Sequence, residues 1–202
     1  MEDYKRANLE SYNRNARVFS EYFKGLLDLE RRHEFKEFVG LLKGNKILDL
    51  GCGGGDHALW FESQSLDTIG IDFSEEMIKI CREKGLKAEV MDIEDLKFDD
   101  NSFDGIWAVT SLLHVPKSKI NHVMDKLSRI LKEEGILYVV VKEGQGEEFI
   151  IDKQNPETKR LFSFWEEKEL LSTFSEKFKI INFWKEKVSS TIYLHAFFRN
   201  NK

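Results

Sequence analysis

Two acidic residues and a run of glycines form the part of the sequence best suited to hold a ligand. The segment ILDLGCGGGDHALW carries Asp49 and glycines at positions 51, 53, 54 and 55, between an apolar run and an amphipathic one. Glycines at such a junction let the backbone bend tightly and approach a ligand closely. Asp72 follows 21 residues after Gly51, at the end of the next apolar run, where a carboxylate can accept hydrogen bonds from ribose hydroxyls. The pattern predicts a site for an adenosine-type ligand.

The acids beside the glycines indicate which adenosine-type ligand fits. A nicotinamide dinucleotide site needs a small residue at position 56, where this chain has Asp56. Asp49 would repel a pyrophosphate, whereas it suits a ligand that carries an ammonium and a sulfonium group. The charges therefore favour S-adenosylmethionine over a dinucleotide.

The elements that must position these residues follow from the apolar pattern. From about Lys46 onward, short apolar runs alternate with amphipathic stretches, which is typical of βαβ units and a parallel sheet. The runs are continuously apolar, so we expect strands buried on both faces. A helix is predicted to start after Ser74 and stop at Gly85, with its buried stripe at Met77, Ile78 and Cys81. The predicted strands cover residues 46–50, 67–72, 88–91, 104–109 and 135–142, and a second helix leads into the last of them with buried positions at Ile120, Val123, Met124, Leu127, Ile130 and Leu131.

The two ends of the chain depart from this alternation. The last two apolar runs, within 178–199, are joined only by the region of Ser189 and Ser190, which is too short for a parallel crossover and predicts an antiparallel hairpin. The fold class is therefore α/β, a doubly wound Rossmann-like, mostly parallel seven-stranded sheet with an antiparallel C-terminal hairpin and helices on both faces. Before Lys46, two helical patterns stand out, the first a candidate cap over a cleft: Val18, Phe19, Tyr22, Phe23 and Leu26, then Phe35, Phe38, Leu41 and Leu42.

We expect a single domain over residues 1–202. Its expected parts are an N-terminal helical cap (1–30), a cofactor-binding core (31–142), a substrate lid (143–165) and a C-terminal helix with the hairpin (166–202). The lid is inferred from a long connection that carries Arg160, Phe162, Phe164 and Trp165, for which an ordinary surface excursion is the alternative.

Composition and charge narrow the possible partners and location. The net charge is −5, with 36 acids interleaved among 31 bases, so no face is prepared to neutralise a run of phosphates and no nucleic acid partner is expected. The two cysteines and five histidines lack metal-ligand spacing, so no metal site is expected. The start of the chain is polar, and no apolar run is long enough for a membrane helix. These features predict a cytoplasmic protein without a membrane partner.

The motifs resemble those of class I S-adenosylmethionine-dependent methyltransferases, of the small-molecule (methyltransferase-11/UbiE-like) type. Residues 49–55 resemble the glycine-rich first motif, and IDFSEEM resembles the second. VMDIEDLKFDDNSFDGIWA is similar to the third and fourth motifs, and LKEEGILYVV to the entry into strand five. The resemblance spans roughly residues 40–142. One departure is Glu133, Glu134 and Gly135, where relatives often have a Pro-Gly-Gly turn.

This resemblance implies roles for individual residues. Tyr12 resembles the aromatic residue of an N-terminal helix that closes over the methionine end of the cofactor, with a core tyrosine as the alternative. The other implied cofactor-binding residues are Asp49, Gly51, Cys52 and Gly53 at the methionine portion, Asp72 at the ribose, Phe73 and Met77 at the adenine face, Asp92 and Ile93 at its polar edge, and Trp107 and Ala108 beside the sulfonium.

The chemistry expected of such a site is transfer of a methyl group to a small acceptor, with S-adenosylhomocysteine as co-product. His114 follows the fourth predicted strand, where open α/β sheets have their ligand crevice, and is a candidate general base or a loop-stabilising residue. Whether oxygen, nitrogen or carbon is methylated stays open, as does the choice between monomer and homodimer. The alternative functions are an NAD(P)-dependent oxidoreductase and a non-catalytic S-adenosylmethionine-binding protein.

Overall fold

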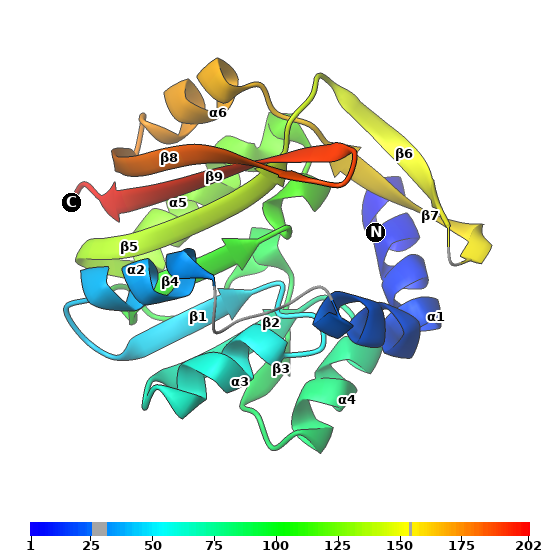
Figure 1. Ribbon diagram of the computed structural model, residues 1–202, viewed down its shortest axis with the longest axis horizontal. Coiled ribbons are helices and arrows are strands. Elements are labelled where there is room, and N and C mark those ends of the chain that lie inside the picture. The colour runs from blue at the N-terminus through cyan, green and yellow to red at the C-terminus, as the bar shows by residue number, and fades with distance from the viewer. Residues whose placement is uncertain (26–31, 154) are drawn as a thin grey trace.

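The computed structural model describes residues 1–25, 32–153 and 155–202 and has a seven-stranded sheet at its centre (Figure 1). The helices are α1 (Asp3–Gly25), α2 (His33–Leu41), α3 (Asp56–Ser63), α4 (Glu75–Glu83), α5 (Ile120–Ile130) and α6 (Glu167–Phe174), with short 3₁₀ turns η1 (Ile93–Asp95), η2 (Leu112–His114) and η3 (Lys117–Lys119). The strands are β1 (Lys46–Leu50), β2 (Asp67–Asp72), β3 (Ala88–Val90), β4 (Phe103–Val109), β5 (Leu131–Lys142), β6 (Glu147–Asp152), β7 (Asn155–Ser163), β8 (Phe178–Val188) and β9 (Thr191–Asn200). Within these described ranges, no helix combines the length and the apolar character needed to cross a membrane.

The main sheet has the strand order β3-β2-β1-β4-β5-β9-β8. Strands β1 to β5 are parallel, whereas β9 is antiparallel to both β5 and β8. The predicted fold class is confirmed, including the C-terminal hairpin, which turns at Ser189 with φ of 55°. β5 begins earlier than predicted, because α5 ends at Ile130 and Leu131 already pairs with Phe103 of β4.

The helix after β2 forms for the reasons that the sequence indicates. The Ser74 side chain accepts a hydrogen bond from the backbone N–H of Met77 at 3.2 Å, which caps the first turn of α4. Met77, Ile78 and Cys81 are fully buried, and Gly85 follows the helix with φ of 82°. The predicted start, buried stripe and stop of this helix are confirmed.

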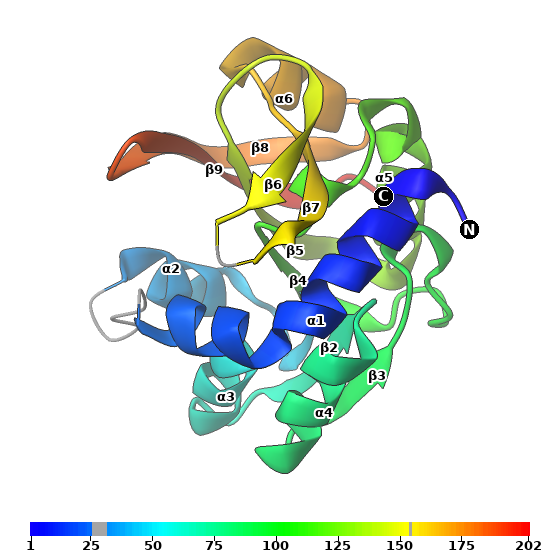
Figure 2. The same ribbon diagram turned by 90° about the vertical axis from the view of Figure 1, so that its right-hand side faces the viewer.

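Helices cover both faces of the sheet (Figures 1 and 2). On one face, α5 and α6 pack in the largest hydrophobic cluster of the described residues. On the other, Phe35 and Phe38 of α2 pack against Trp107 of β4, with ring centroids 4.5 Å and 5.1 Å from the indole. Trp107 in turn lies 4.3 Å from Tyr138 on β5. These two layers hold the parallel strands, and their carboxyl ends, in fixed positions.

The third part of the molecule is a cover made of α1 and the β6–β7 hairpin, which lie next to each other (Figure 2). The hairpin forms the connection after β5, where the sequence analysis expected a lid but no strands. The buried side of α1 also differs from the expectation: Phe19 is buried, but Val18 is 54% and Tyr22 is 51% exposed. The Phe23 side chain and Leu26 lie outside what the structure describes. The apolar pattern of this helix failed as a guide because its buried face is largely polar, with Asn8, Ser11, Asn15 and Ser20.

Gly105 of β4 tests the packing of α2 on the sheet. A Cβ at this position would lie 2.6 Å from both Leu42 Cδ2 and Phe38 Cζ, so Gly105→Ala must displace the side chains through which α2 and its C-terminal end pack on the sheet. We expect the free energy of unfolding to fall by about 1–3 kcal/mol in urea titrations. Gly40→Ala, within α2 and with no atom near its added Cβ, is the control and should raise that free energy by about 0.5–1 kcal/mol. Equal effects of the two substitutions would contradict this packing.

Candidate functional site

A cavity of about 450 Å³ lies where strands β1 to β4 end beneath α1. Its walls come from the residues that follow these strands, from α1, and from β8 and β9. Among the described residues, those that were predicted for the site and line this cavity are Tyr12, Gly51, Cys52, Gly53, Asp72, Phe73, Met77, Asp92, Ile93 and His114. Three other predicted residues, Asp49, Trp107 and Ala108, do not line it.

The glycine loop forms the floor of the cavity. The backbone N–H groups of Gly51 and Cys52 both donate to the carbonyl of Ile71, at 2.8 Å and 2.9 Å, which fixes the loop on β2. Gly51 has φ of +74°, and a Cβ there would meet the Ser111 Cβ at 2.5 Å. Only glycine therefore allows the loop to bend here and lie against the end of β4.

Asp72 has a carboxylate that is held in place from two sides. Gly53 N–H donates to its Oδ2 at 3.0 Å, and Ser74 N–H donates to its Oδ1 at 2.8 Å. Burial raises the pKa of Asp72, and these backbone donors oppose that rise. Each carboxylate oxygen keeps a further lone pair, so the group can still accept hydrogens from two vicinal hydroxyls.

Asp49 lies behind the glycine loop instead of in the cavity wall. Asp49 is 2% exposed, and its carboxyl group accepts a hydrogen bond from the backbone N–H of Ala58. Its Oδ2 has no hydrogen-bond partner among the described residues. Burial and the neighbouring charge of Asp72 raise the pKa of Asp49 to about 8. A positive charge above the loop would favour ionisation of this carboxyl, because an opposite charge stabilises the anion.

Acids outnumber bases in the cavity wall, but most of them are paired. Among the described lining residues, the acids are Asp56, Asp72, Asp92, Glu94 and Glu186, and the bases are Lys5 and Arg32. Lys5 pairs with Asp92 and Glu94, Arg32 with Glu186, and Lys84 with Asp56, so Asp72 is the lining acid that only backbone N–H groups hold. Both lining bases are thus already paired and do not offer a pyrophosphate a free cation, whereas the Asp72 carboxylate suits a ligand with positive charge such as S-adenosylmethionine. In the part of the chain that the structure describes, no cluster of three or more His, Cys, Asp or Glu residues is placed to hold a metal ion.

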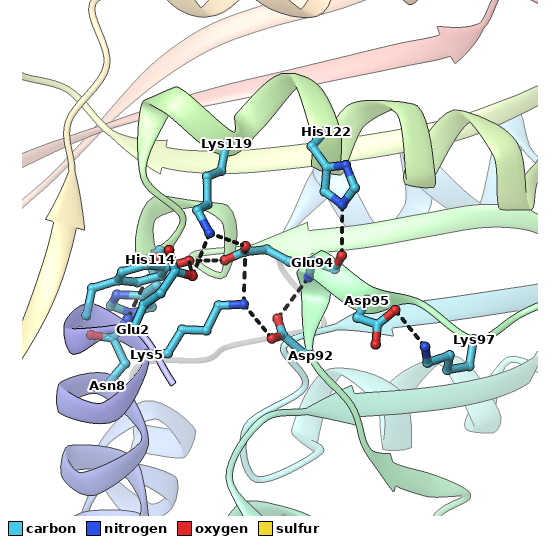
Figure 3. Close-up of polar contacts among 11 residues, drawn as sticks. Glu2, Lys5, Asn8, Asp92, Glu94, Asp95, Lys97, His114, Lys119 and His122 are labelled. Atoms are coloured by element: carbon cyan, nitrogen blue, oxygen red, sulfur yellow. Dashed lines mark hydrogen bonds and ion pairs between the residues drawn. The ribbon is translucent and has the colours of Figure 1, made fainter.

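The far end of the cavity, beyond β3, is where the resemblance puts adenine. Asp92 caps η1, with its Oδ1 accepting from Glu94 N–H at 2.9 Å. Its Oδ2 lies 2.7 Å from the Nζ of Lys5, which reaches over from the first turn of α1 (Figure 3). The sequence analysis missed Lys5.

Tyr12 of α1 and His114 of η2, which both line the cavity, form a hydrogen-bonded pair. The Nδ1 of His114 lies 2.7 Å from the carbonyl of Leu161, an acceptor, so Nδ1 carries the proton. The Nε2 therefore accepts from the Tyr12 hydroxyl at 2.7 Å. Burial and the charge of Arg160 lower the pKa of His114 to about 3, so its imidazole is neutral and weakly basic. Its role as a general base stays a prediction, and this environment disfavours it.

The Tyr12 hydroxyl also accepts a hydrogen bond from Arg160 of β7 at 3.0 Å. Arg160 is held by Asp152 of β6 at 2.7 Å, and Asp152 accepts from Ser11 of α1 at 2.5 Å. Buried polar contacts thus join α1 to the β6–β7 hairpin directly beside the cavity. Trp165, expected in a lid, is instead fully buried in the main hydrophobic cluster and anchors the end of the hairpin.

Trp107 and Ala108, which were predicted beside the sulfonium, do not line the cavity. Trp107 points into the aromatic layer under α2, where its Nε1 donates to His57 Nδ1 at 3.0 Å, and Ala108 points to the opposite, α5 face. The part of this segment that lines the cavity starts directly after Ala108, with Val109, Thr110 and Ser111, because β4 stays buried through Ala108.

Thr110 has a backbone conformation that its side chain makes unfavourable. Its φ is +53°, which is rare for a β-branched residue and costs about 1–3 kcal/mol. Its N–H donates to the carbonyl of Val140 at 2.9 Å, which holds the turn against β5. Strain of this kind, held by the surrounding structure, is frequent at functional sites.

A second group of missed lining residues lies on the α2 side of the sheet: Arg32, His57, Val140, Glu186, Tyr193 and His195. Residues two apart on a strand share a face, so His195 lies on the same face of β9 as the buried Phe197 and next to it on the cavity side. Val140 lies in the same way beside Tyr138 on β5, and the two pairs are neighbours across the strands. The sequence shows this alternation, but it does not show that β9 pairs with β5.

Comparison with known proteins supports a methyltransferase. Residues 47–135 match the family model described as "Methyltransferase domain". Phosphoethanolamine N-methyltransferase 3 of Arabidopsis thaliana is 37% identical over 119 residues, covering 55% of this chain and 24% of that protein. Demethylmenaquinone methyltransferase of Listeria monocytogenes is 33% identical over 137 residues, covering 63% of this chain and 55% of that protein. The match thus spans about a quarter of the first relative's length and about half of the second's.

The fold has close counterparts among solved structures. A structure of an S-adenosylmethionine-dependent methyltransferase from Methanosarcina mazei superposes with a TM-score of 0.76, covering 86% of this chain and 99% of that one. At 22% identity, this likeness concerns the fold.

Asp49 makes stability depend on pH in a predictable direction. With a pKa of about 8 in the folded chain and about 3.9 when unfolded, the folded state binds the extra proton between these values. Stability from this group is full below pH 4 and is lost as the pH rises towards 8. In urea titrations, Asp49→Asn should therefore gain stability relative to the parent chain with rising pH, by at most about 1.4 kcal/mol per pH unit. A difference that stays constant from pH 5 to 8 would contradict the buried, protonated carboxyl.

Thr110→Gly should relieve backbone strain. We expect an increase of about 0.5–1 kcal/mol in the free energy of unfolding together with slower turnover, because the turn beside the cavity loses its fixed shape. Ser65→Gly, at an exposed residue with φ of 64°, is the matched control and should gain stability without a loss of turnover. Loss of stability in Thr110→Gly would show that the turn is not strained.

Proposed function

We propose that this chain is a class I S-adenosylmethionine-dependent methyltransferase, which transfers the methyl group of S-adenosylmethionine to a small-molecule acceptor and releases S-adenosylhomocysteine. The match of residues 47–135 to a methyltransferase family model and the likeness to known methyltransferases support this proposal. The observation that carries the proposal is the acidic cavity over the glycine loop, with the Asp72 carboxylate fixed at the end of β2. The residues present fit this cofactor. Asp72 would bind the ribose hydroxyls, Phe73 and Met77 would flank the adenine, and the buried acid Asp49 would stabilise the ammonium.

The bound cofactor would supply an electrophilic methyl group on a sulfonium, which an acceptor attacks in line. The protein then mainly has to align the acceptor and exclude water. We propose that the Thr110 turn, Val140 and Tyr193 border the acceptor, since they line the part of the cavity between the glycine loop and β9. With a pKa of about 3, His114 is a weak base at neutral pH. We propose that it acts instead by accepting the hydrogen of Tyr12, which fixes that hydroxyl at the cavity wall.

A small acceptor is favoured by the enclosure of the site. α1 and the β6–β7 hairpin are tied to each other by the Ser11–Asp152 and Tyr12–Arg160 contacts. Together they would serve as the cap and lid of a single domain, which leaves room for a small molecule more readily than for a protein or nucleic acid. The names of the relatives above specify phosphoethanolamine and demethylmenaquinone as their acceptors, and we propose a small-molecule acceptor for this chain as well.

The two alternative functions, a nicotinamide oxidoreductase and a non-catalytic S-adenosylmethionine-binding protein, require different sites. A nicotinamide oxidoreductase requires a pyrophosphate site, which this cavity disfavours because both of its described lining bases, Lys5 and Arg32, are already paired with acids. A non-catalytic S-adenosylmethionine-binding protein would need no room for an acceptor, whereas this cavity continues past the cofactor region to Tyr193 and His195.

The test is incubation of the purified chain with methyl-labelled S-adenosylmethionine and a fractionated cell extract. We expect label in the small-molecule fraction, and at least about tenfold less with Asp72→Asn, because hydrogen bonds to the ribose are lost. Asp67→Asn is the control, because Asp67 is half-buried at the other end of β2 and lies outside the cavity, and this variant should behave like the parent chain. Label only on protein or nucleic acid would overturn the acceptor class. Absence of labelling with a rise in melting temperature caused by NADH would overturn the methyltransferase proposal.

A further inference from the structure

The first turn of α1 is joined to the segment after β3 by a chain of ion pairs (Figure 3). The Nζ of Lys5 lies 2.7 Å from Asp92 Oδ2 and 3.2 Å from Glu94 Oε2. The same Glu94 oxygen lies 3.1 Å from the Nζ of Lys119 in η3, which also lies 2.5 Å from Glu2. We call these residues, together with Tyr4, whose hydroxyl donates to Glu94, the α1 clasp.

Lys5 is the central member of the clasp, because among the described residues it is the lysine that pairs with both Asp92 and Glu94. Its side chain is 17% exposed, and that of Glu94 is 10% exposed. Burial lowers the pKa of Lys5, while its bonds to Asp92 and Glu94 raise it by more, so the ammonium is charged at neutral pH. Ion pairs so little exposed are screened less than surface pairs and hold their elements together more firmly.

The clasp lies at the adenine end of the cavity. Tyr4 and Lys5 line the same cavity as Asp92, Ile93 and Glu94, so the first turn of α1 forms its wall there. In the clasp, Asp92 uses one contact on each oxygen, from Glu94 N–H and from Lys5. A carboxylate offers about four acceptor positions, so Asp92 can accept an adenine amino group while Lys5 stays bonded to it.

We propose that Lys5 is a positioning residue of the cofactor site: its bonds to Asp92 and Glu94 close α1 over the adenine end, and the cofactor leaves only after these bonds open. The inference rests on the proposed function, because it takes the cofactor to be an adenosine compound bound over Asp72 and Asp92. It adds a residue outside every motif by which the sequence resembles its family, and it makes cofactor release depend on an electrostatic contact.

The ion pair between Lys97 and Asp95 provides a matched control. Lys97 lies 2.7 Å from Asp95 in the same segment, and both side chains are at least 60% exposed (Figure 3). Neither residue lines the cavity. Lys97→Met therefore removes a lysine–aspartate pair of the same length and from the same segment without touching α1.

The experiment measures release of radiolabelled S-adenosylhomocysteine, chased with unlabelled compound, from the full chain. We expect Lys5→Met to speed release about tenfold, since a shielded charge pair mainly affects dissociation. Lys5→Arg, which keeps the charge, should restore slow release. Lys97→Met should release at the parental rate.

A second readout needs no ligand. In hydrogen exchange of the unliganded protein, Lys5→Met should expose the amides of the first two turns of α1 while the amides of α5 keep their protection. This excludes global unfolding as the cause of faster release.

The outcomes separate this inference from the proposed function. If the parent chain does not bind S-adenosylhomocysteine, the cofactor assignment fails, and the role of Lys5 fails with it. If the parent binds it but Lys5→Met releases it within twofold of the parental rate, or no faster than Lys97→Met, only the role of Lys5 is overturned.

Discussion

Burial of two carboxyl groups next to a glycine loop is the constraint on which the rest of the site depends. Asp49 and Asp72 lie at the ends of neighbouring parallel strands, and the charge of Asp72 adds to burial in raising the pKa of Asp49. The loop between them bends through positive-φ glycines and offers backbone N–H groups to β2 and Asp72, not to an incoming phosphate. The strand order, the α2 and α5 layers and the cap of α4 all serve to keep these two strand ends in register. A cationic nucleoside would lower the electrostatic cost of ionising these carboxyl groups, and a pyrophosphate would raise it.

A polar cover completes the cavity. The side of α1 that meets the β6–β7 hairpin carries Asn8, Ser11, Tyr12 and Asn15, which is unusual for a buried helix face and expensive unless each group is bonded. The structure satisfies them: Asn8 Oδ1 accepts from Leu161 N–H at 2.8 Å, and Asn15 donates to Thr158 at 3.1 Å. Such contacts fix the position of α1 by hydrogen-bond geometry, and they open at a lower cost than an apolar interface would when water can replace them. This suits a helix that must admit and release a ligand.

Features that depend on residues close together in the sequence could be predicted, whereas features that depend on the packing of distant elements could not. The parallel strands, the capped helix at Ser74 and the C-terminal hairpin depend on local periodicity and turn length, and the sequence predicts all three. The glycine loop and Asp72 could be assigned to one site, because their spacing in the sequence indicates that they follow two consecutive strands. Lys5, Glu186 and His195 could not be found this way, because their places in the cavity depend on how distant elements pack. One signal was available and was not used: Asn8, Ser11, Tyr12 and Asn15 recur at helical spacing and mark a polar buried face. The sequence also does not show where a buried strand ends relative to a cavity, and Trp107, which was predicted for the site, lies in the strand and not in the cavity wall.

Calorimetry of S-adenosylmethionine binding at pH 6.5, repeated in buffers of different ionisation enthalpy, tests the central claim most directly. If the acidic crevice retains a cationic nucleoside, the folded chain binds the cofactor and releases up to about one proton, because Asp49, with its pKa near 8, ionises beneath the ligand ammonium. No binding heat with this cofactor or its demethylated form, alongside clear binding of a pyrophosphate dinucleotide, would contradict the account.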